Sequence, residues 1–340
     1  MSEPMKALRL HAVGGPDDLR LDTVDVPSLA ENDVLVRLRA AALNHRDVFI
    51  TRGLYPKIAL PVTLGSDGAG NVAALGRDQR GNFAVGDEVV IDPMLDWGDD
   101  PSVWDDSHSS ILGMPRDGTF AEYVAVPATA VYAKPKPLSM EEAAAIPLAG
   151  LTAYRALFTR GKVQPGETVL IPGVGGGVQT FVLLFAKRAG ARAIVTSGSD
   201  GKLERARGLG ADLTLNYSST PDWQRAMRSE RVDLVVDSSG GETLRKALDV
   251  VRPGGRVVVY GGTAGEATIK LFPLFWKHVS VLGTSMGSPD DFAAMLELFG
   301  DGLRPVIDRA FALEDGTAAF ARLDAGEQFG KIILRCSETP

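Results

Sequence analysis

The sequence predicts an α/β protein in which a β-rich part comes first and a parallel sheet covered by helices follows. Three observations support this prediction. The 340 residues are 45% hydrophobic and 23% charged, so the chain is long enough for two domains with separate cores. Short apolar runs separated by Gly, Pro, Asn and Asp fill the region before residue 130. From about residue 138, strand-like runs alternate with helix-like runs, which is typical of a parallel sheet with helices on both faces.

The β-rich part holds strand candidates whose spacing indicates a compact, barrel-like domain. They are residues 5–10, 33–39, 86–91 and 121–126. The helical signal begins at Ser139, which stands three residues before Glu142 in the pattern of a capping box. Further strand candidates follow, with helical runs between them: residues 168–171, 193–196, 233–237, 256–260 and 279–282. After about Asp290 a helix returns, and the chain closes on a predicted strand at residues 330–334.

A glycine-rich turn follows the strand at residues 168–171 and leads into an apolar helix. Its residues are Gly173, Gly175, Gly176, Gly177 and Val178. Such a turn begins a dinucleotide site, because glycine lets the backbone approach a pyrophosphate, whose charge then faces free N–H groups at the helix start. Val178 stands where the third glycine of the fingerprint would be, so an ordinary glycine-rich turn stays an alternative for this stretch alone.

Charge and composition exclude several classes of function. The net charge is −7, and no run of Lys or Arg occurs, which argues against a nucleic-acid or anionic-membrane surface. No apolar run reaches membrane-spanning length and the first residues do not resemble a signal peptide, so we expect a cytoplasmic protein. The single cysteine, Cys336, excludes an intrachain disulfide, and its place near the C-terminus makes it a poor candidate for a nucleophile.

Several short motifs follow one another in a fixed order along nearly the whole chain. They are residues 44–47, 53–56, 64–70, 86–89, 149–154, the glycine-rich turn, 208–212, 237–240 and 329–332. In this order they resemble the medium-chain dehydrogenase/reductase superfamily, and within it the zinc-free quinone oxidoreductase and enoyl reductase branch. The resemblance implies a GroES-like β-rich catalytic domain built from residues 1–133 and 287–340. It also implies an inserted Rossmann domain, a doubly wound parallel sheet for NAD(P), at residues 134–286, with the active site in the cleft.

Many members of this superfamily hold a catalytic zinc, and a second zinc bound by four cysteines. The resemblance places other residues at the positions of the catalytic ligands: Asn44, Ser66, Asp67 and Leu148. Zinc takes sulfur, nitrogen or carboxylate ligands in tetrahedral array, which leucine and serine do not supply. Residues 92–113 take the place of the cysteine lobe without any cysteine. We therefore predict no zinc, with a makeshift site from His45, Asp67 or His108 as the alternative.

The predicted loss of zinc narrows the chemistry. Zinc lowers the pKa of bound water from about 15.7 to about 7, and a bound alcohol benefits similarly. Arg46 also replaces the relay hydroxyl of zinc-dependent relatives. Conjugated acceptors need only orientation, hydrogen-bond donors and a proton source. We therefore predict an NADPH-dependent, zinc-independent oxidoreductase that transfers hydride to a quinone or an activated C=C bond. An alcohol dehydrogenase and a non-catalytic NADPH-binding sensor or structural protein are the alternatives, and the sequence does not identify the substrate.

The resemblance also implies roles for the residues of the first motifs. Tyr55 matches the proton donor of enoyl reductases; the alternative is a loop tyrosine that packs under Pro56. Asn44 is expected to offer its amide near the nicotinamide. Asp47 is expected to hold the loop that shapes the pocket, and a purely structural role is the alternative. His45 is expected against the cofactor pyrophosphate, or else as a solvated imidazole.

Cofactor choice is predicted from the end of the strand at residues 193–196. NAD-specific sites place an acidic residue there for the ribose hydroxyls. Small hydroxyl residues such as Ser197 and Ser199, and a lysine, suit a 2′-phosphate better. The resemblance implies that Lys202 and Tyr217 match positions that contact this phosphate in NADPH enzymes. Asp200 is acidic and close; we interpret it as an early helix residue favoured by the helix dipole. We therefore expect NADP(H) as the cofactor, with NAD(H) as the alternative. For Lys202, a solvated lysine on the helix surface is also an open alternative.

The resemblance implies further cofactor contacts at strand ends, where open α/β sheets bind ligands. They are Thr152, Ser238, Gly261, Gly262, Thr263, Thr284 and Lys331. Lys331 is expected on the nicotinamide side, with a strand-edge lysine as the plainer alternative. Relatives usually pair through the edge of the sheet, so Phe272, Phe275 and Trp276 are expected either at the seam of a homodimer or in the core.

Overall fold

The computed structural model describes residues 4–77 and 83–337 and divides the chain into two compact units. Unit 1 consists of Met1–Ala149 and Ser288–Pro340, and unit 2 of Gly150–Gly287. The division therefore falls after Ala149 rather than after residue 133. The reason is that helix α2 (Met140–Ala145) packs against strands β3, β5 and β18 of unit 1. Its expected capping box is present, because the side chains of Ser139 and Glu142 each bond the other residue's backbone N–H.

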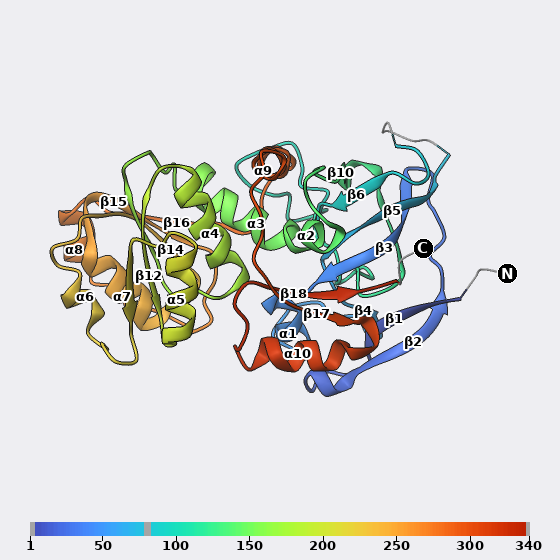
Figure 1. Cartoon of the computed structure of the whole chain (residues 1–340), viewed down its shortest axis with the longest axis horizontal. Coiled ribbons are helices and arrows are strands. Elements are labelled where there is room, and N and C mark those ends of the chain that lie inside the picture. The colour runs from blue at the N-terminus through green and yellow to red at the C-terminus, as the bar shows by residue number, and fades with distance from the viewer. Residues whose placement is uncertain (1–3, 78–82, 338–340) are drawn as a thin grey trace. The chain divides into compact units, whose positions relative to one another are not determined.

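Unit 1 is built around a mixed sheet whose main path has the order β10-β6-β5-β3-β18-β17, with β9 paired to β3. Its strands are β3 (Asp33–Ala42), β5 (Asp67–Leu75), β6 (Glu88–Ile91), β9 (Tyr123–Pro127), β10 (Val131–Ala133), β17 (Ile307–Ala312) and β18 (Lys331–Arg335). Strand β18 pairs antiparallel with β3 near Ala42, as Figure 1 shows, so both ends of the chain build this sheet. This confirms the predicted GroES-like architecture.

Shorter elements complete unit 1. The strands are β1 (Pro4–Leu10), β2 (Leu19–Asp25), β4 (Val62–Thr63), β7 (Met94–Leu95) and β8 (Ser110–Ile111), and the helices α1 (His45–Thr51), α9 (Pro289–Gly300) and α10 (Gly316–Asp324). Alternate residues of β3 point into the core, where Leu38 and Phe120 are fully buried. Cys336 lies in the same core, and burial raises the pKa of its thiol, which agrees with the prediction that it is no nucleophile.

Unit 2 is a parallel sheet of order β13-β12-β11-β14-β15-β16 covered by helices. Its strands are β11 (Thr168–Ile171), β12 (Arg192–Ser197), β13 (Leu213–Asn216), β14 (Val232–Asp237), β15 (Val251–Val259) and β16 (Ser280–Gly283). Its helices are α3 (Pro147–Tyr154), which begins in unit 1, α4 (Gly177–Arg188), α5 (Asp200–Gly208), α6 (Trp223–Ala226), α7 (Gly241–Val250) and α8 (Leu271–Trp276). Every residue of β11 is buried, as expected for a strand covered on both faces.

The order of the strands fixes where unit 2 can bind a ligand. The chain moves outward from β11 to β12 and β13, then returns to add β14, β15 and β16 on the other side. Neighbouring helices therefore diverge between β11 and β14 at the carboxyl end of the sheet, and a crevice opens there. Among the residues that the structure describes, no helix has the length and apolar character needed to cross a membrane.

Candidate active site and cofactor site

A cluster of polar side chains is buried in unit 1, where α1, β5 and β18 all begin. Its members are Asn44, Arg46, Asp47, Ser66, Asp67 and Lys331, and each is at most 7% exposed. Charged groups are rarely buried unless they are paired and hydrogen-bonded, because desolvation is costly. The cluster is therefore held together by specific contacts.

The ammonium group of Lys331 lies at the centre of this cluster. Its Nζ donates to Asp67 Oδ2 at 2.8 Å, to Asn44 Oδ1 at 2.7 Å and to the carbonyl oxygen of Leu43 at 2.8 Å. An ammonium group has three N–H donors, so all of them are used. The side chain is 2% exposed, and β18 lies between β3 and β17, so Lys331 is not the strand-edge lysine of the alternative. The expected place of Lys331 on the nicotinamide side stays a prediction.

Asp67 is the anionic partner in the cluster and is fully satisfied. Its Oδ2 also accepts from Asn44 Nδ2 at 2.9 Å, and its Oδ1 accepts from the backbone N–H of Leu148 at 2.7 Å. Asn44 thus uses both ends of its amide, one on Lys331 and the other on Asp67. The expected role of Asn44 beside the nicotinamide is limited accordingly, because only one amide hydrogen is left outside these contacts.

Arg46 connects the cluster to Tyr55. Its Nη1 donates to Ser66 Oγ at 2.7 Å and to the carbonyl oxygen of Leu112 at 3.0 Å. The guanidinium carbon lies 5.3 Å from the centroid of the Tyr55 ring, a cation–π contact. The half-buried ring of Tyr55 also packs against the core of unit 1. Tyr55 is therefore held by Arg46 and by apolar packing.

Asp47 caps the helix that carries Arg46. Its Oδ2 accepts from the backbone N–H of Asn44 at 2.8 Å, which satisfies an N–H at the start of α1. Its Oδ1 has no hydrogen-bond partner among the described residues, and the nearest Arg46 nitrogen is 4.0 Å away. Burial raises the pKa of Asp47 to about 6, against the opposing effect of Arg46. The geometry thus supports the loop-holding role that the sequence predicted.

The residues of this cluster do not fit a zinc ion. Ser66 donates to a carbonyl, Leu148 contributes only its backbone N–H, and the ammonium of Lys331 already contacts Asn44 and Asp67. Within residues 4–77 and 83–337, no group of three or more His, Cys, Asp or Glu side chains could hold a metal.

The two histidines of the alternative zinc site lie outside this cluster. His45 is exposed on α1, with its ring 6.4 Å from that of Phe49, and His108 contacts Asp105 at 3.2 Å. They do not join Asp67 in a common site.

The glycine-rich turn of unit 2 has the geometry of an anion cradle. Gly173 and Gly175 have φ of 71° and 125°, which side chains rarely adopt, and Gly176 caps α4. The first N–H groups of α4 have no partner within the helix, so they suit an anion. A Cβ at Gly175 would lie 2.8 Å from Lys202 Cδ, so the lysine side chain runs along this turn. A positive charge and free N–H groups thus meet at one place, which fits a dinucleotide phosphate.

The residues expected around the adenosine end gather after β12 and β13. Ser197 is the last residue of β12, and the hydroxyl of Ser199 caps α5 by accepting from the Lys202 N–H at 3.4 Å. A Cβ at Gly198 would lie 2.8 Å from the ring of Tyr217, so the ring covers this turn.

Asp200, the acidic residue close to this turn, contacts the last residue of β13. Its Oδ1 accepts from Asn216 Nδ2 at 2.7 Å. This contact agrees with the interpretation of Asp200 as a residue of the first turn of α5.

Of the other residues predicted to contact the cofactor, Thr152 is buried in α3. The rest follow the carboxyl ends of β14, β15 and β16: Ser238, Gly261, Gly262, Thr263 and Thr284. A Cβ at Gly261 would lie 2.8 Å from the carbonyl oxygen of Ser238, and the Thr263 N–H bonds the same oxygen at 3.3 Å. The Thr284 N–H bonds the carbonyl of Val259 at 3.0 Å. Backbone segments thus approach one another closely at this end of the sheet, and glycine permits that approach at Gly261.

A cavity of about 230 Å³ lies at the point where the strand order of unit 2 reverses. The residues that line it come mainly from the ends of β11, β12 and β14 and from α7: Pro172, Gly173, Thr196, Tyr217, Pro221, Trp223, Ser239, Glu242, Thr243 and Lys246. Sequence reasoning missed several of these. It also missed Gln179, whose amide bonds Ser238 from the first turn of α4; its place directly after the glycines was the available signal.

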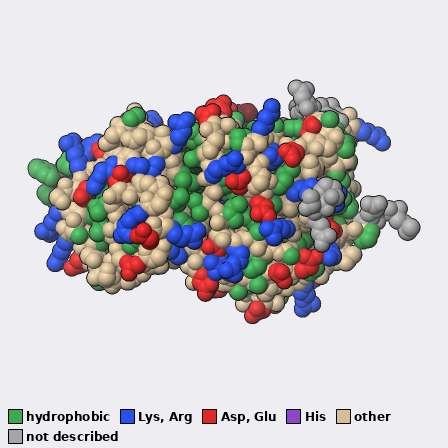
Figure 2. All heavy atoms as spheres, viewed as in Figure 1, with side chains coloured by type: hydrophobic (Ala, Val, Ile, Leu, Met, Phe, Trp, Pro, Cys, Tyr) green, Lys and Arg blue, Asp and Glu red, His purple; other side chains and the backbone are tan. Residues whose placement is uncertain are grey.

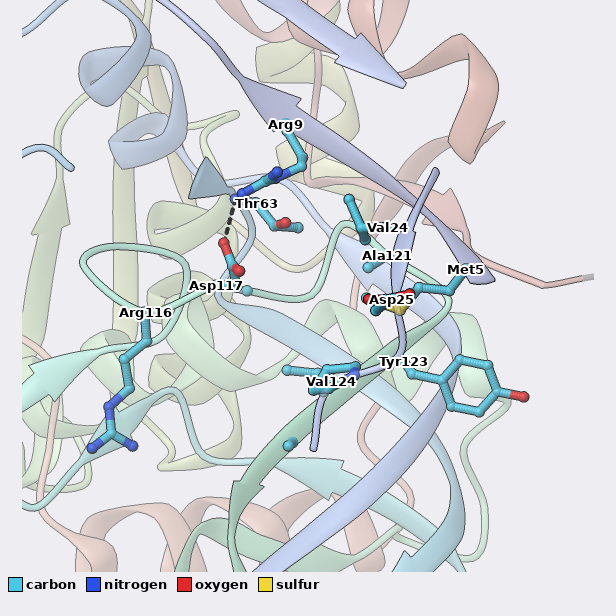
Figure 3. Close-up of a pocket in the computed structure, with 13 residues that line it drawn as sticks. Met5, Arg9, Val24, Asp25, Thr63, Arg116, Asp117, Ala121, Tyr123 and Val124 are labelled. Carbon is cyan, nitrogen blue, oxygen red and sulfur yellow. Dashed lines mark hydrogen bonds between the residues drawn. The ribbon is translucent and has the colours of Figure 1, made fainter. Parts of the chain in front are cut away.

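Unit 1 has a separate cavity of about 260 Å³, shown in Figure 3. It shares no residue with the polar cluster. The Asp117 carboxylate accepts from the Thr63 N–H at 2.7 Å, and the Arg9 guanidinium donates to the Pro61 carbonyl at 2.9 Å. Figure 3 shows the side chains of Arg116 and Tyr123 directed away from the other lining residues. Arg9 and Asp117 thus each make a contact with the backbone, Arg116 is turned outward, and we place the candidate site elsewhere.

Comparison with known proteins agrees with this architecture. A family model described as an alcohol dehydrogenase GroES-like domain matches residues 30–136, and one described as a zinc-binding dehydrogenase matches residues 177–301. The zinc-type alcohol dehydrogenase-like protein YogA of Leptosphaeria maculans is 37% identical over 93% of this chain and 94% of its own. A 2-methylene-furan-3-one reductase of Solanum lycopersicum is 34% identical over 97% and 79%, respectively. A quinone oxidoreductase of Pseudomonas aeruginosa is 31% identical over 97% and 99%.

Solved structures match over nearly the whole chain. The crystal structure of an NAD-dependent alcohol dehydrogenase matches with a TM-score of 0.92 at 38% identity, over 98% of this chain and 100% of the other. The 2-octenoyl-CoA carboxylase reductase CinF, solved with NADP and 2-octenoyl-CoA, matches with a TM-score of 0.90 at 25% identity, over 99% and 88%. This chain therefore belongs to the medium-chain dehydrogenase/reductase superfamily and is an NAD(P)-dependent oxidoreductase.

Proposed function

We propose that this oxidoreductase is an NADPH-dependent, zinc-independent reductase of quinones or of activated C=C bonds. The observation that carries the proposal is the buried contact of Lys331 with Asn44 and Asp67. A cation of the protein itself occupies this place, and the surrounding donors do not form a zinc cage. Without a Lewis acid, the substrates that fit best are those that accept hydride through conjugation, because charge then spreads to a distant oxygen. The relatives of Solanum lycopersicum and Pseudomonas aeruginosa are named for reactions of this class, as a 2-methylene-furan-3-one reductase and a quinone oxidoreductase.

In this proposal, bound NADPH supplies the hydride, and residues of unit 1 handle the proton. Tyr55 is the proton donor, because it is a half-buried phenol held by apolar packing on one side. The guanidinium of Arg46 orients the ring, and the contacts of Arg46 with Ser66 and Leu112 keep the guanidinium in place. Asp47 and Asn44 support Arg46 by fixing the start of α1.

The preference for NADPH rests on the residues after β12. Lys202 lies along the glycine-rich turn, and Ser197, Ser199 and Tyr217 supply hydroxyl groups nearby. Asp200, the acidic residue that follows β12 most closely, accepts a hydrogen bond from Asn216. A 2′-phosphate therefore finds a cation and donors there. The expected pyrophosphate contact of His45 stays part of this proposal, since its ring is exposed at the start of α1.

We further propose that the enzyme is a homodimer that pairs through α8 and β16. Four apolar residues of α8 are exposed rather than buried in the core: Leu271 by 68%, Phe272 by 62%, Phe275 by 60% and Trp276 by 70%. Figure 2 shows hydrophobic side chains at the end of unit 2 that carries α8 in Figure 1. Strand β16 ends the sheet next to this helix. Exposed apolar patches beside an open sheet edge are typical of association surfaces.

The experiment that tests the function compares a quinone and an enone in the wild type and in Tyr55→Phe. The variant is expected to reduce the enone with kcat about 10²- to 10⁴-fold lower, because the positioned acid is lost. Quinone reduction is expected to persist, since a hydroquinone takes protons from water. Absence of NADPH oxidation with every quinone and enone tested would refute the function, and unchanged enone turnover in Tyr55→Phe would remove Tyr55 from the mechanism.

The second candidate is an alcohol dehydrogenase. It is favoured by the printed names of the Leptosphaeria relative and of the structure with the TM-score of 0.92. The two candidates differ in their need for metal. Alcohol oxidation that depends on one bound zinc per chain and stops on chelation would favour the second candidate.

A further inference from the structure

The ammonium group of Lys331 takes no part in the proton transfer proposed above, yet it is among the most completely buried charges of the chain. It comes from β18, near the C-terminal end. Its partners come from two other segments: Leu43 and Asn44 from the turn between β3 and α1, and Asp67 from the first position of β5. One cation thus joins three segments that are far apart in the sequence.

The surroundings of this ammonium are those of a cation site. Three oxygens, a backbone carbonyl, an amide carbonyl and a carboxylate, lie 2.7–2.8 Å from Nζ. Oxygen donors of these kinds also hold metal ions in proteins. Here the cation is covalently attached, and a divalent ion added beside it would be repelled by Lys331 and by the nearby guanidinium of Arg46.

We propose that Lys331 is a built-in cation that takes the place of a metal ion and acts as a positioning residue for the start of α1. It fixes Asn44, which caps α1; α1 carries Arg46, and Arg46 contacts the ring of Tyr55. The link to Tyr55 rests on the proposed function. The role of Lys331 as a built-in cation does not rest on the proposed function, because it concerns only the stability and occupancy of the cluster.

The test removes the ammonium and returns it as a free ion. Lys331→Ala deletes three methylenes and Nζ, which n-propylammonium replaces group for group. The melting temperature of the variant is expected to fall by about 6 to 20 °C, because Asp67 is left buried without its ion pair. Added n-propylammonium chloride is expected to recover about half of this loss and to raise kcat for NADPH-driven reduction. The wild type, whose site is filled, is expected to show neither effect.

Matched controls separate this rescue from general effects of salt or apolar solutes. Lys331→Met fills the cavity without a charge, so it is expected to be destabilised and not rescued. Tetramethylammonium, which cannot donate hydrogen bonds, and neutral n-propanol are expected to rescue neither variant. Should Lys331→Ala not fold in plain buffer, its refolding yield with and without n-propylammonium gives the same information.

The proposal is overturned if n-propylammonium restores neither stability nor refolding yield, or if propanol and tetramethylammonium work equally well. It is also overturned if wild-type protein purified with Lys331 intact binds one divalent metal per chain in this cluster. Recovered stability without recovered kcat would remove only the link to Tyr55, and would leave the cation role standing. Loss of the proposed reaction in the wild type would not alter the thermal result, so the two failures are distinguishable.

Discussion

The ion pair of Lys331 and Asp67 allows a quantitative prediction about the stability of unit 1. The carboxylate and the ammonium are 2.8 Å apart, with side chains 0% and 2% exposed. Breaking a buried pair from one side leaves an uncompensated charge and costs about 3 to 5 kcal/mol. Asp67→Asn and Lys331→Met are therefore each expected to lower the free energy of unfolding by this amount. For a unit of roughly 200 residues, this corresponds to a fall in melting temperature of about 6 to 20 °C.

The double variant decides whether the pair itself is responsible. Asp67→Asn with Lys331→Met leaves neither charge buried alone, so it is expected to be more stable than either single variant, as measured by urea unfolding followed by circular dichroism. Asp233→Asn is a matched control, because its partner Arg252 is partly exposed, and a loss of about 1 kcal/mol is expected there. A double variant that loses the sum of the two single effects would refute the reasoning.

The remaining predictions concern the cofactor, the dimer and a buried carboxyl. Lys202→Ala is expected to raise KM for NADPH about tenfold or more and KM for NADH little, in steady-state assays, because a charge-assisted contact is lost. Equal changes in the two KM values would contradict the phosphate role, and Lys136→Ala, at an exposed lysine of unit 1, is the control. Trp276→Glu is expected to convert a dimer to a monomer in light scattering, and a monomeric wild type would contradict the interface. Burial raises the pKa of Asp92 to about 8, so the protonated carboxyl stabilises the fold at low pH and this contribution is lost as pH rises through 8. Asp92→Asn keeps an acceptor for the Met94 N–H and is expected to stabilise the protein by about 4 kcal/mol at pH 7 and not at pH 4, which thermal melts at both pH values check.

Local sequence patterns predicted most of the fold, because the secondary structure that each segment prefers is also the one that its tertiary contacts require. The apolar run of residues 168–171 is a strand buried on both faces, and the capping box of Ser139 and Glu142 is formed. The predicted turn at Gly173 and Gly175 is formed, and both glycines have positive φ values. Strand β13 was missed, because its short run of half-buried residues at the sheet edge gives a weak periodic signal.

The polar cluster was predicted only in part, because its contacts join distant segments. The resemblance placed Asn44, Ser66 and Asp67 at positions that bind the catalytic zinc or lie beside it in relatives. The position of Lys331, however, depends on the pairing of β18 with β3, which no local pattern encodes. The contact of Arg46 with Tyr55 likewise depends on the loop that follows α1. Tertiary structure therefore determines which groups the lysine contacts, and it also places α2 in unit 1 rather than in unit 2.

The central claim is that this oxidoreductase works without a metal, and the most direct measurement combines turnover with metal content. Protein is dialysed against a strong chelator, its metal content is determined by elemental mass spectrometry, and NADPH oxidation is followed with a quinone and an enone. The account predicts undiminished turnover with less than about 0.1 metal atom per chain. Turnover that disappears on chelation and returns with one equivalent of zinc would contradict it.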